Sequence, residues 1–114
     1  MEKFKQLLFN KNLGKAIDIG TRRGEFLFRL KEHALSFDEL IGIDTNEKEI
    51  ALLKEKEEEN IHFITMDGYS IEYPDEYFDT VALSNTLHHL NNIEGMLNEM
   101  IRVLKKGGYF IINE

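Results

Sequence analysis

The chain of 114 residues contains no cysteine. This excludes a disulfide framework, a cysteine nucleophile and a zinc site built from thiolates. The chain also has no run approaching the roughly 18 apolar residues of a membrane-spanning helix, and its first residues, Met1 to Lys5, lack the apolar stretch of a signal peptide. We therefore expect a protein of the cytoplasm, a compartment in which disulfides are rare, with no membrane-spanning segment.

Positive charge is also scarce, because 14 Lys and Arg stand against 21 Asp and Glu, which gives a net charge of −7. Broad binding to a nucleic-acid backbone needs clustered basic side chains, so the composition argues against a nucleic-acid partner. Hydrophobic residues make up 42% and charged residues 31% of the chain, as in ordinary globular proteins. The length suits one domain spanning residues 1–114.

Short runs rich in β-branched residues alternate with longer stretches of helical periodicity, the pattern of βαβ units over a parallel sheet. It predicts an α/β protein with strands at residues 15–20, 40–44, 61–66, 78–84 and 109–113 and helices at 2–10, 24–34, 46–60 and 91–104. Asn46, with Glu49 three residues later, predicts a capping box for the third helix, with Thr45 as the alternative cap. Gly107 and Gly108 are expected to end the last helix.

A glycine loop follows the first predicted strand, in the order Asp18-Ile19-Gly20-Thr21-Arg22-Arg23-Gly24. A glycine at the end of a strand permits a tight turn and close approach to a ligand, and the next helix directs its free N–H groups to the same place. Asp44 ends the second strand, where a carboxylate can accept hydrogen bonds from ribose hydroxyls. The alternatives are a plain strand-to-helix turn for the loop and a surface cap for Asp44.

Together these residues resemble the class I S-adenosylmethionine-dependent methyltransferase family. That family has an acidic residue followed by Gly-x-Gly-x-Gly; Asp18, Gly20 and Gly24 match, and Arg22 replaces the middle glycine. The Gly-x-Gly-x-x-Gly loop of dinucleotide-binding folds is absent. Further matches occur at Met66-Asp67-Gly68, at Phe78-Asp79-Thr80-Val81, at Leu87-His88-His89-Leu90 and at Arg102 to Gly108, where Lys106 replaces a proline.

The resemblance implies a Rossmann-like three-layer α/β/α fold with a mostly parallel sheet, five strands in the order 3-2-1-4-5, and S-adenosylmethionine as cofactor. Gly20, Thr21 and Gly24 would pass around its methionine part, and Asp18 would anchor the loop and reach the ammonium. Asp44 would hold the ribose, with Thr45 beside it. The implied adenine site comprises Met66, Asp67 and Gly68. Asn85 would lie near the sulfonium and the acceptor.

Two departures from the family pattern concern Arg22 and the end of the chain. Arg22 has three interpretations: it turns outward to water, it pairs with the carboxylate of the cofactor, or it crowds the pocket. The family's sheet continues for two strands beyond the fifth, so the last predicted strand would form an exposed edge. We expect either a homodimer through this strand or a fragment of a longer enzyme.

His88 and His89 are adjacent, and no carboxylate lies at ligand spacing, so we expect no metal. His88 and Asn85 are the weak catalytic candidates, and the catalytic residues stay undefined. The leading interpretation is methyl transfer to a small-molecule acceptor. Two alternatives are a truncated domain that binds the cofactor, or nothing, without catalysis, and a nucleotide- or dinucleotide-binding oxidoreductase domain.

Overall fold

Five short apolar runs form strands that pair side by side in one parallel sheet, in the order β3-β2-β1-β4-β5. The computed structural model describes residues 10–84, 86 and 90–113, so the predicted helix at residues 2–10 lies almost entirely outside the described residues. The elements are β1 (Lys15–Ile19), α2 (Glu25–His33), β2 (Glu39–Asp44), α3 (Glu47–Lys54), β3 (Ile61–Thr65), β4 (Phe78–Ser84), α4 (Ile93–Val103) and β5 (Leu104–Asn113). The predicted fold class and strand order are confirmed.

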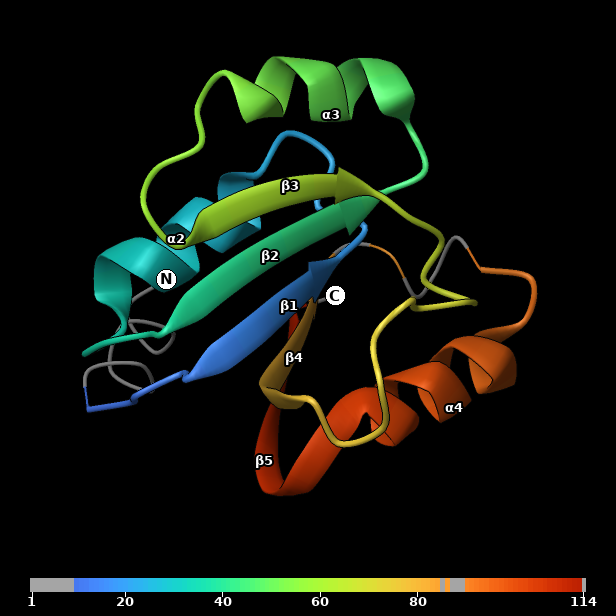
Figure 1. Cartoon of the computed structure of the whole chain (residues 1–114). Coiled ribbons are helices and arrows are strands. Elements are labelled where there is room, and N and C mark those ends of the chain that lie inside the picture. Colours follow the sequence, from blue (N-terminus) through green and yellow to red (C-terminus); the bar gives the residue numbers. More distant parts are fainter. Residues whose placement is uncertain (1–9, 85, 87–89, 114) are drawn as a thin grey trace.

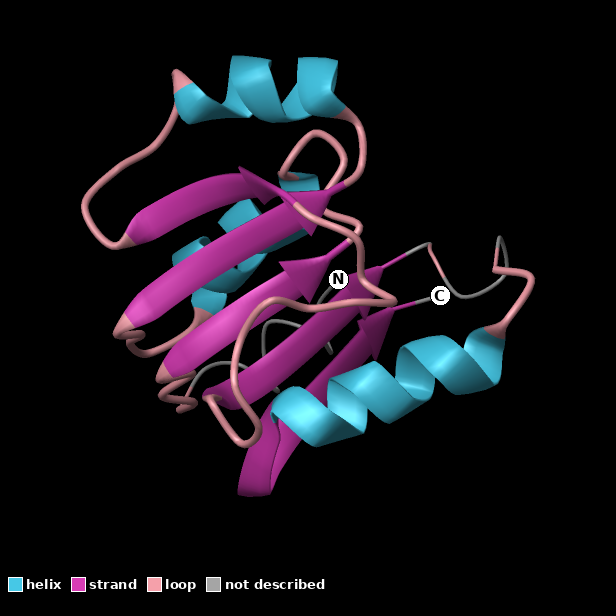
Figure 2. Ribbon diagram, turned by 45° about the vertical axis from the view of Figure 1, so that its right-hand side comes forward, coloured by secondary structure: helices cyan, strands magenta, loops and turns pink. Residues whose placement is uncertain are grey.

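Helices cover both faces of the sheet, with α2 and α3 on one side and α4 on the other (Figure 1). Neighbouring residues of a strand point to opposite faces, so each central strand contributes to two cores. In β1, Ala16 packs in the core with Leu27 of α2, whereas Ile17 packs in the core with Met100 of α4. This explains why the central strands are apolar on both faces. Figure 2 shows that all five strands run in one direction, so their carboxyl ends gather at one edge.

The helix α3 begins at Asn46, whose side chain accepts hydrogen bonds from the N–H groups of Lys48 and Glu49 at 3.1 Å each. Asn46 is therefore the cap and Thr45 is not. The predicted capping box is formed in part: the Asn46 side chain accepts the N–H of Glu49, whereas the N–H of Asn46 donates to Oδ1 of Asp44 at 2.9 Å. The helix ends at Lys54 and not near residue 60, because the exposed charged residues 55–59 offer no apolar side chain to pack on the sheet.

The prediction that Gly107 and Gly108 end the last helix is wrong. The helix α4 ends at Val103, and β5 begins at Leu104, which pairs with Phe78. The glycines instead lie inside β5 at a register shift against β4. Gly107 adopts a left-handed φ of 79°, and a Cβ on Gly108 would lie 2.6 Å from the carbonyl oxygen of Asp79. No helix in the described ranges is long and apolar enough to cross a membrane.

Arg102, near the end of α4, ties the long segment between β3 and β4 to the helix. Its guanidinium donates to the carbonyl oxygens of Ile71 at 2.7 Å and Tyr73 at 3.0 Å. It also bonds both carboxylate oxygens of Glu99, at 2.7 and 3.1 Å, and lies 2.8 Å from Oδ1 of Asp75. The hydrogen bonds from Arg102 hold the pKa of Glu99 below its usual range. One planar side chain thereby fixes the course of the segment that follows β3.

Replacing Arg102 by Gln should lower the free energy of unfolding by about 1–3 kcal/mol, because two backbone carbonyl groups and two carboxylates lose charged donors. Arg102→Lys keeps the charge but not the planar fork, and we expect it to lose most of the same stability. Urea unfolding followed by circular dichroism measures both variants. Wild-type stability in Arg102→Lys would show that charge alone suffices.

Candidate functional site

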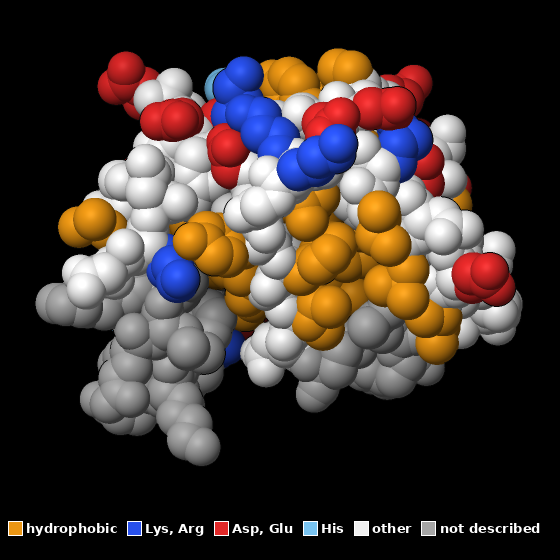
Figure 3. All heavy atoms as spheres, turned by 90° about the horizontal axis from the view of Figure 1, so that it is seen from below, with side chains coloured by type: hydrophobic (Ala, Val, Ile, Leu, Met, Phe, Trp, Pro, Cys, Tyr) orange, Lys and Arg blue, Asp and Glu red, His pale blue; other side chains and the backbone are white. Residues whose placement is uncertain are grey.

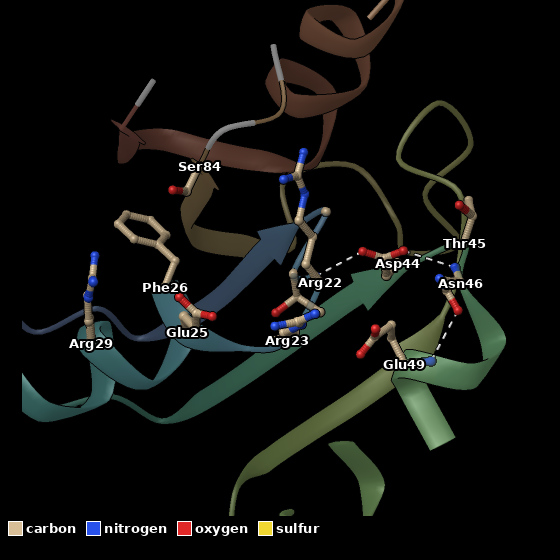
Figure 4. Close-up of a pocket in the computed structure, with 12 residues that line it drawn as sticks. Arg22, Arg23, Glu25, Phe26, Arg29, Asp44, Thr45, Asn46, Glu49 and Ser84 are labelled. Atoms are coloured by element: carbon tan, nitrogen blue, oxygen red, sulfur yellow. Dashed lines mark hydrogen bonds between the residues drawn. The ribbon is translucent and has the colours of Figure 1, made fainter. Parts of the chain in front are cut away.

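The carboxyl ends of β1, β2 and β4 surround a cavity of about 740 Å³. Ligands of open parallel sheets bind at this edge, where neighbouring strands connect to helices on opposite faces. Figure 4 shows that the lining side chains come from α2, from the loop before it and from the start of α3. The lining residues are Gly20, Thr21, Arg22, Arg23, Glu25, Phe26, Arg29, Asp44, Thr45, Asn46, Glu49 and Ser84.

Asp44 joins the two loops that form this cavity. Its Oδ2 accepts the N–H of Arg22 at 2.9 Å, and its Oδ1 accepts the N–H of Asn46 at 2.9 Å. The first bond holds the glycine loop after β1, and the second holds the turn into α3 (Figure 4). An ionised carboxylate has about four acceptor positions, so each oxygen keeps capacity for a ligand hydroxyl. The half-buried Asp44 is thus both an anchor and an available acceptor.

The glycine loop contains a tight turn, in which the N–H of Gly24 donates to the carbonyl oxygen of Thr21 at 2.7 Å. Gly20, Arg22 and Gly24 all have left-handed φ angles, of 70°, 51° and 77°. The N–H of Thr21 donates to the carbonyl oxygen of Ile43 at 2.8 Å, which joins the loop to β2. A Cβ on Gly20 would lie 2.7 Å from Oγ1 of Thr86. Gly20 is therefore required by its backbone conformation and by the segment after β4 packed against it.

Gly20→Ala should lower the free energy of unfolding by more than Gly107→Ala. Both positions have left-handed backbone, which costs an alanine about 1–2 kcal/mol. A Cβ on Gly107 meets nothing within 4 Å, whereas one on Gly20 overlaps Thr86, and overpacking costs about a further 1–3 kcal/mol. Thermal and urea unfolding of both variants give the difference. Equal losses would show that the contact with Thr86 imposes no constraint.

Asp18 lies beneath the glycine loop and is 2% exposed. Burial raises its pKa from 3.8 to about 7; the nearby hydroxyl of Thr21 opposes this rise, and the charge of Asp44 adds to it. Its Oδ2 and the Oγ1 of Thr21 are buried without a hydrogen-bond partner in the part of the chain that the structure describes. Buried polar atoms are normally satisfied, so this pair has unused capacity for a polar or cationic group.

The raised pKa of Asp18 predicts a pH-dependent stability. Between about pH 4 and pH 7 the folded state holds the Asp18 proton more tightly than the unfolded state does, so stability falls as the pH rises through this window. One pKa unit corresponds to about 1.4 kcal/mol. Between pH 4 and pH 7, the free energy of unfolding of the wild type should therefore fall by up to about 4 kcal/mol relative to that of Asp18→Asn. Urea unfolding of both proteins from pH 4 to pH 8 tests this. Parallel stability curves would contradict the raised pKa.

Comparison with known proteins identifies the family to which this fold and loop belong. Residues 17–112 match the family model described as a methyltransferase domain. The chain belongs to the methyltransferase-domain family. The match covers β2 and β4 in full and the carboxyl end of β1, so it includes the strand ends that border the cavity.

The methyltransferase domain is 32% identical over 103 residues to the demethylmenaquinone methyltransferase of Bacteroides fragilis, covering 86% of this chain and 42% of that relative. The chain thus spans less than half the length of that relative. The crystal structure of YcgJ from Bacillus subtilis superposes with a TM-score of 0.81 at 23% identity, covering 97% of this chain and 48% of that one. The [4+2]-cyclase SpnF superposes with a TM-score of 0.80 at 20% identity, covering 97% of this chain and 43% of that one. Such structural likeness establishes the fold and leaves the reaction open.

Four of the predicted binding residues line the cavity of the methyltransferase domain: Gly20, Thr21, Asp44 and Thr45. Asp18 lies beneath the loop, and Gly24 is the N-cap of α2. The three predicted adenine-site residues are not among the lining residues. Met66 is nevertheless next to the site, since its N–H donates to the carbonyl oxygen of Asp44 at 3.0 Å, while Asp67 accepts the N–H of Tyr69 at 2.8 Å and Gly68 is buried. Asn85, His88 and His89 lie outside the described residues.

The sequence prediction missed several lining residues, which are Arg23, Glu25, Phe26, Arg29, Asn46, Glu49 and Ser84. A signal was present for two of them, because Arg22, Phe26 and Arg29 are spaced by four and three residues and so share one side of a helix and its first turn. Within the described ranges, no three His, Asp or Glu side chains come together in a way that could hold a metal ion.

The residues of the site fit a nucleoside-like group that also carries an amino acid. Asp44 offers acceptor capacity for sugar hydroxyls, while Asp18 and Thr21 hold unsatisfied polar atoms under the loop. The lining residues also include three arginines, which are donors for an anion. S-adenosylmethionine has all three kinds of group, namely a ribose, an ammonium and a carboxylate. Among the described lining residues there is no cysteine or histidine to act as nucleophile or base.

Proposed function

We propose that this chain is the cofactor-binding domain of an S-adenosylmethionine-dependent methyltransferase that acts on a small-molecule acceptor. The observation that carries the proposal is the Asp44 carboxylate, which holds the glycine loop over a cavity of about 740 Å³ in a chain of the methyltransferase-domain family. The Bacteroides fragilis relative is named for a small-molecule quinone acceptor, which supports an acceptor of that size. The cytoplasmic location stays a prediction.

Each residue has a proposed role in holding the cofactor. Gly20 and Thr21 pass around its methionine part, with Gly24 shaping the turn into α2. Asp44 accepts hydrogen bonds from the ribose hydroxyls, with Thr45 beside it. The adenine is proposed to lie toward the end of β3, where the carbonyl oxygen of Asp44 accepts the N–H of Met66 and where the proposed adenine-site residues are Met66, Asp67 and Gly68.

Asp18 is proposed to favour binding of the ammonium, because a cation nearby stabilises the ionised form of a buried carboxyl. Its pKa of about 7 in the free protein means that binding at pH 6 releases a proton to the buffer. Asn85 stays the candidate nearest the reacting centre, and His88 stays the candidate base, both as predictions from the sequence.

The bound cofactor would supply the chemistry, since its sulfonium is an activated methyl donor. What the chain has to add is alignment and exclusion of water, which account for much of the rate in such transfers. The held loop, the anchoring carboxylate and the apolar side chain of Phe26 in the wall suit that task. Such a site would need no activated nucleophile among its described lining residues.

A second candidate function is a domain that binds the cofactor but needs a further segment or partner for turnover. The observation that favours it is that this chain spans 42% of the Bacteroides fragilis relative. Isothermal titration with S-adenosylhomocysteine and, in parallel, with NAD tests cofactor binding in both candidates. Heat with S-adenosylhomocysteine alone is expected; heat with NAD alone would support the oxidoreductase alternative. A screen of small-molecule acceptors then separates turnover from binding.

Asp44→Ala should weaken S-adenosylhomocysteine binding about ten- to hundredfold, roughly 1.5–3 kcal/mol, because charge-assisted hydrogen bonds are lost. The same change frees the N–H groups of Arg22 and Asn46, so Asp44→Asn is the companion variant that keeps the side-chain shape. Titration calorimetry gives the affinities, and thermal unfolding confirms that each variant folds. Unchanged affinity in a folded Asp44→Ala protein would remove Asp44 from the cofactor site.

We also propose that β5 pairs with β5 of a second copy. Among the described strands β5 pairs with β4 alone, and Tyr109, Phe110 and Ile112 are 44–46% exposed. Hydrophobic side chains gather on the side of the molecule seen from below in Figure 3. An open apolar edge strand is a template for pairing with another chain. Light scattering at high micromolar concentration should give a dimer, and a monodisperse monomer would contradict this.

A further inference from the structure

The glycine loop packs closely against the chain that leaves β4. A Cβ built on Gly20 would lie 2.7 Å from Oγ1 of Thr86, 3.3 Å from its Cγ2 and 3.6 Å from its Cβ. The backbone of Gly20 therefore meets both branches of the Thr86 side chain. Gly20 also lines the cavity of about 740 Å³, so this contact lies at one wall of the site.

A hydrogen bond within its own segment orients the side chain of Thr86. Its Oγ1 donates to the carbonyl oxygen of Ser84, the last residue of β4, at 2.9 Å. Local bonds of this kind, from a hydroxyl to a nearby backbone group, shape the chain outside regular structure. Threonine is branched at Cβ and restricted in χ1, so this one bond determines where both Oγ1 and Cγ2 of the half-buried Thr86 lie.

Thr86 contacts two residues that line the cavity. Ser84 lines it at the end of β4 (Figure 4), and Gly20 lines it at the end of β1. In the parallel pairing of these strands Ile19 lies opposite Leu83, so Gly20 and Ser84 directly follow a paired position. The sheet thus brings the two strand ends together, and Thr86 lies where it can set the separation of the segments that leave them.

The glycine loop is held from both strands that flank β1. On the β2 side, Asp44 accepts the N–H of Arg22 at 2.9 Å. On the β4 side, the side chain of Thr86 meets the backbone of Gly20. A loop that is confined on both sides before a ligand arrives needs less ordering when the ligand binds, and this favours affinity.

We propose that Thr86 is a positioning residue of the cofactor site, whose hydrogen bond to Ser84 sets the separation between the glycine loop and the end of β4. This proposal rests on the proposed function. Thr86 is not among the residues that line the described cavity, so its effect on a ligand passes through Gly20 and Ser84. Without the hydroxyl, the side chain is free to turn away from Gly20, and the cavity wall loses its fixed position.

The test compares wild type with Thr86→Val and Thr86→Ser. Valine has nearly the shape of threonine but cannot donate a hydrogen bond, whereas serine keeps the hydroxyl and loses Cγ2. Thr65→Val is the matched control, because Thr65 is exposed at the end of β3 and does not line the cavity. Titration calorimetry with S-adenosylhomocysteine measures the affinity of each protein, and thermal unfolding confirms that each variant folds.

Thr86→Val should weaken the binding of S-adenosylhomocysteine about three- to tenfold, the loss expected for one hydrogen bond, whereas Thr86→Ser should bind within about twofold of wild type. A side chain that only fills space would give the reverse order, because valine fills the space and serine does not. That reverse order, or a Thr86→Val affinity equal to that of Thr65→Val, overturns the positioning role.

A second measurement tests the contact with Gly20 without any ligand. Gly20→Ala should lower the melting temperature less in a Thr86→Ala background than in wild type, because the two atoms that its Cβ would meet most closely are then absent. Melting-temperature shifts that simply add would overturn the contact on which the proposal rests. Failure of the wild type to bind S-adenosylhomocysteine instead overturns the proposed function, so the two failures are distinguishable.

Discussion

The site depends on one carboxylate with two backbone partners. Asp44 receives the N–H of Arg22 from the glycine loop and the N–H of Asn46 from the turn into α3. These loops belong to different βα units, and parallel pairing of β1 with β2 brings their carboxyl ends together. Without this bridge, the left-handed turn at Arg22 would lose the hydrogen bond that Asp44 accepts, and the glycine loop would lose its link to the turn into α3. The sheet brings the glycine loop and the turn into α3 together, and the hydrogen bonds to Asp44 hold them in place.

A second constraint lies directly below this bridge. Asp18 is buried under the loop with a pKa near 7, and one of its oxygens has no partner among the described residues. A buried carboxyl of this kind lowers stability once it ionises. A bound cation would offset that cost by favouring the ionised form. The raised pKa therefore predicts that the free protein is less stable at neutral pH than at pH 4, and that a bound cation would recover part of the difference.

Most of the strands and helices can be predicted from the sequence, because the hydrophobic periodicity of each element is visible within a short run of residues. Residues 78–84 were predicted as a strand and form β4 without change, since an apolar run between turns has few alternatives. Gly107 and Gly108 show the limit of such reasoning. A glycine pair after a helical stripe predicts a helix end, yet pairing of Leu104 with Phe78 starts β5 earlier and moves both glycines into the strand. Long-range pairing is not visible in a local pattern.

In the candidate site, too, some residues could be predicted from the local sequence and others depend on long-range packing. Four predicted residues line the cavity, namely Gly20, Thr21, Asp44 and Thr45. Their positions could be predicted because each follows or ends a strand, and the strands themselves are recognisable in the sequence. Ser84 and Glu49 reach it through the packing of separate elements, which one sequence does not encode in any short motif. Arg29 falls between these cases, since its helical spacing from Arg22 and Phe26 is visible but the side of the sheet it faces is not.

The central claim is that the loop held by Asp44 forms the ligand site, and the amide spectrum of the protein tests it most directly. Two-dimensional NMR of uniformly 15N-labelled protein, titrated with S-adenosylhomocysteine, reports on every backbone N–H at once. The account predicts that the largest shifts fall on Thr21, Arg22 and Asn46, with Gly107 and Tyr109 at the opposite end of the sheet unchanged. Saturable shifts concentrated around Gly107 to Tyr109, with Arg22 and Asn46 unmoved, would contradict it.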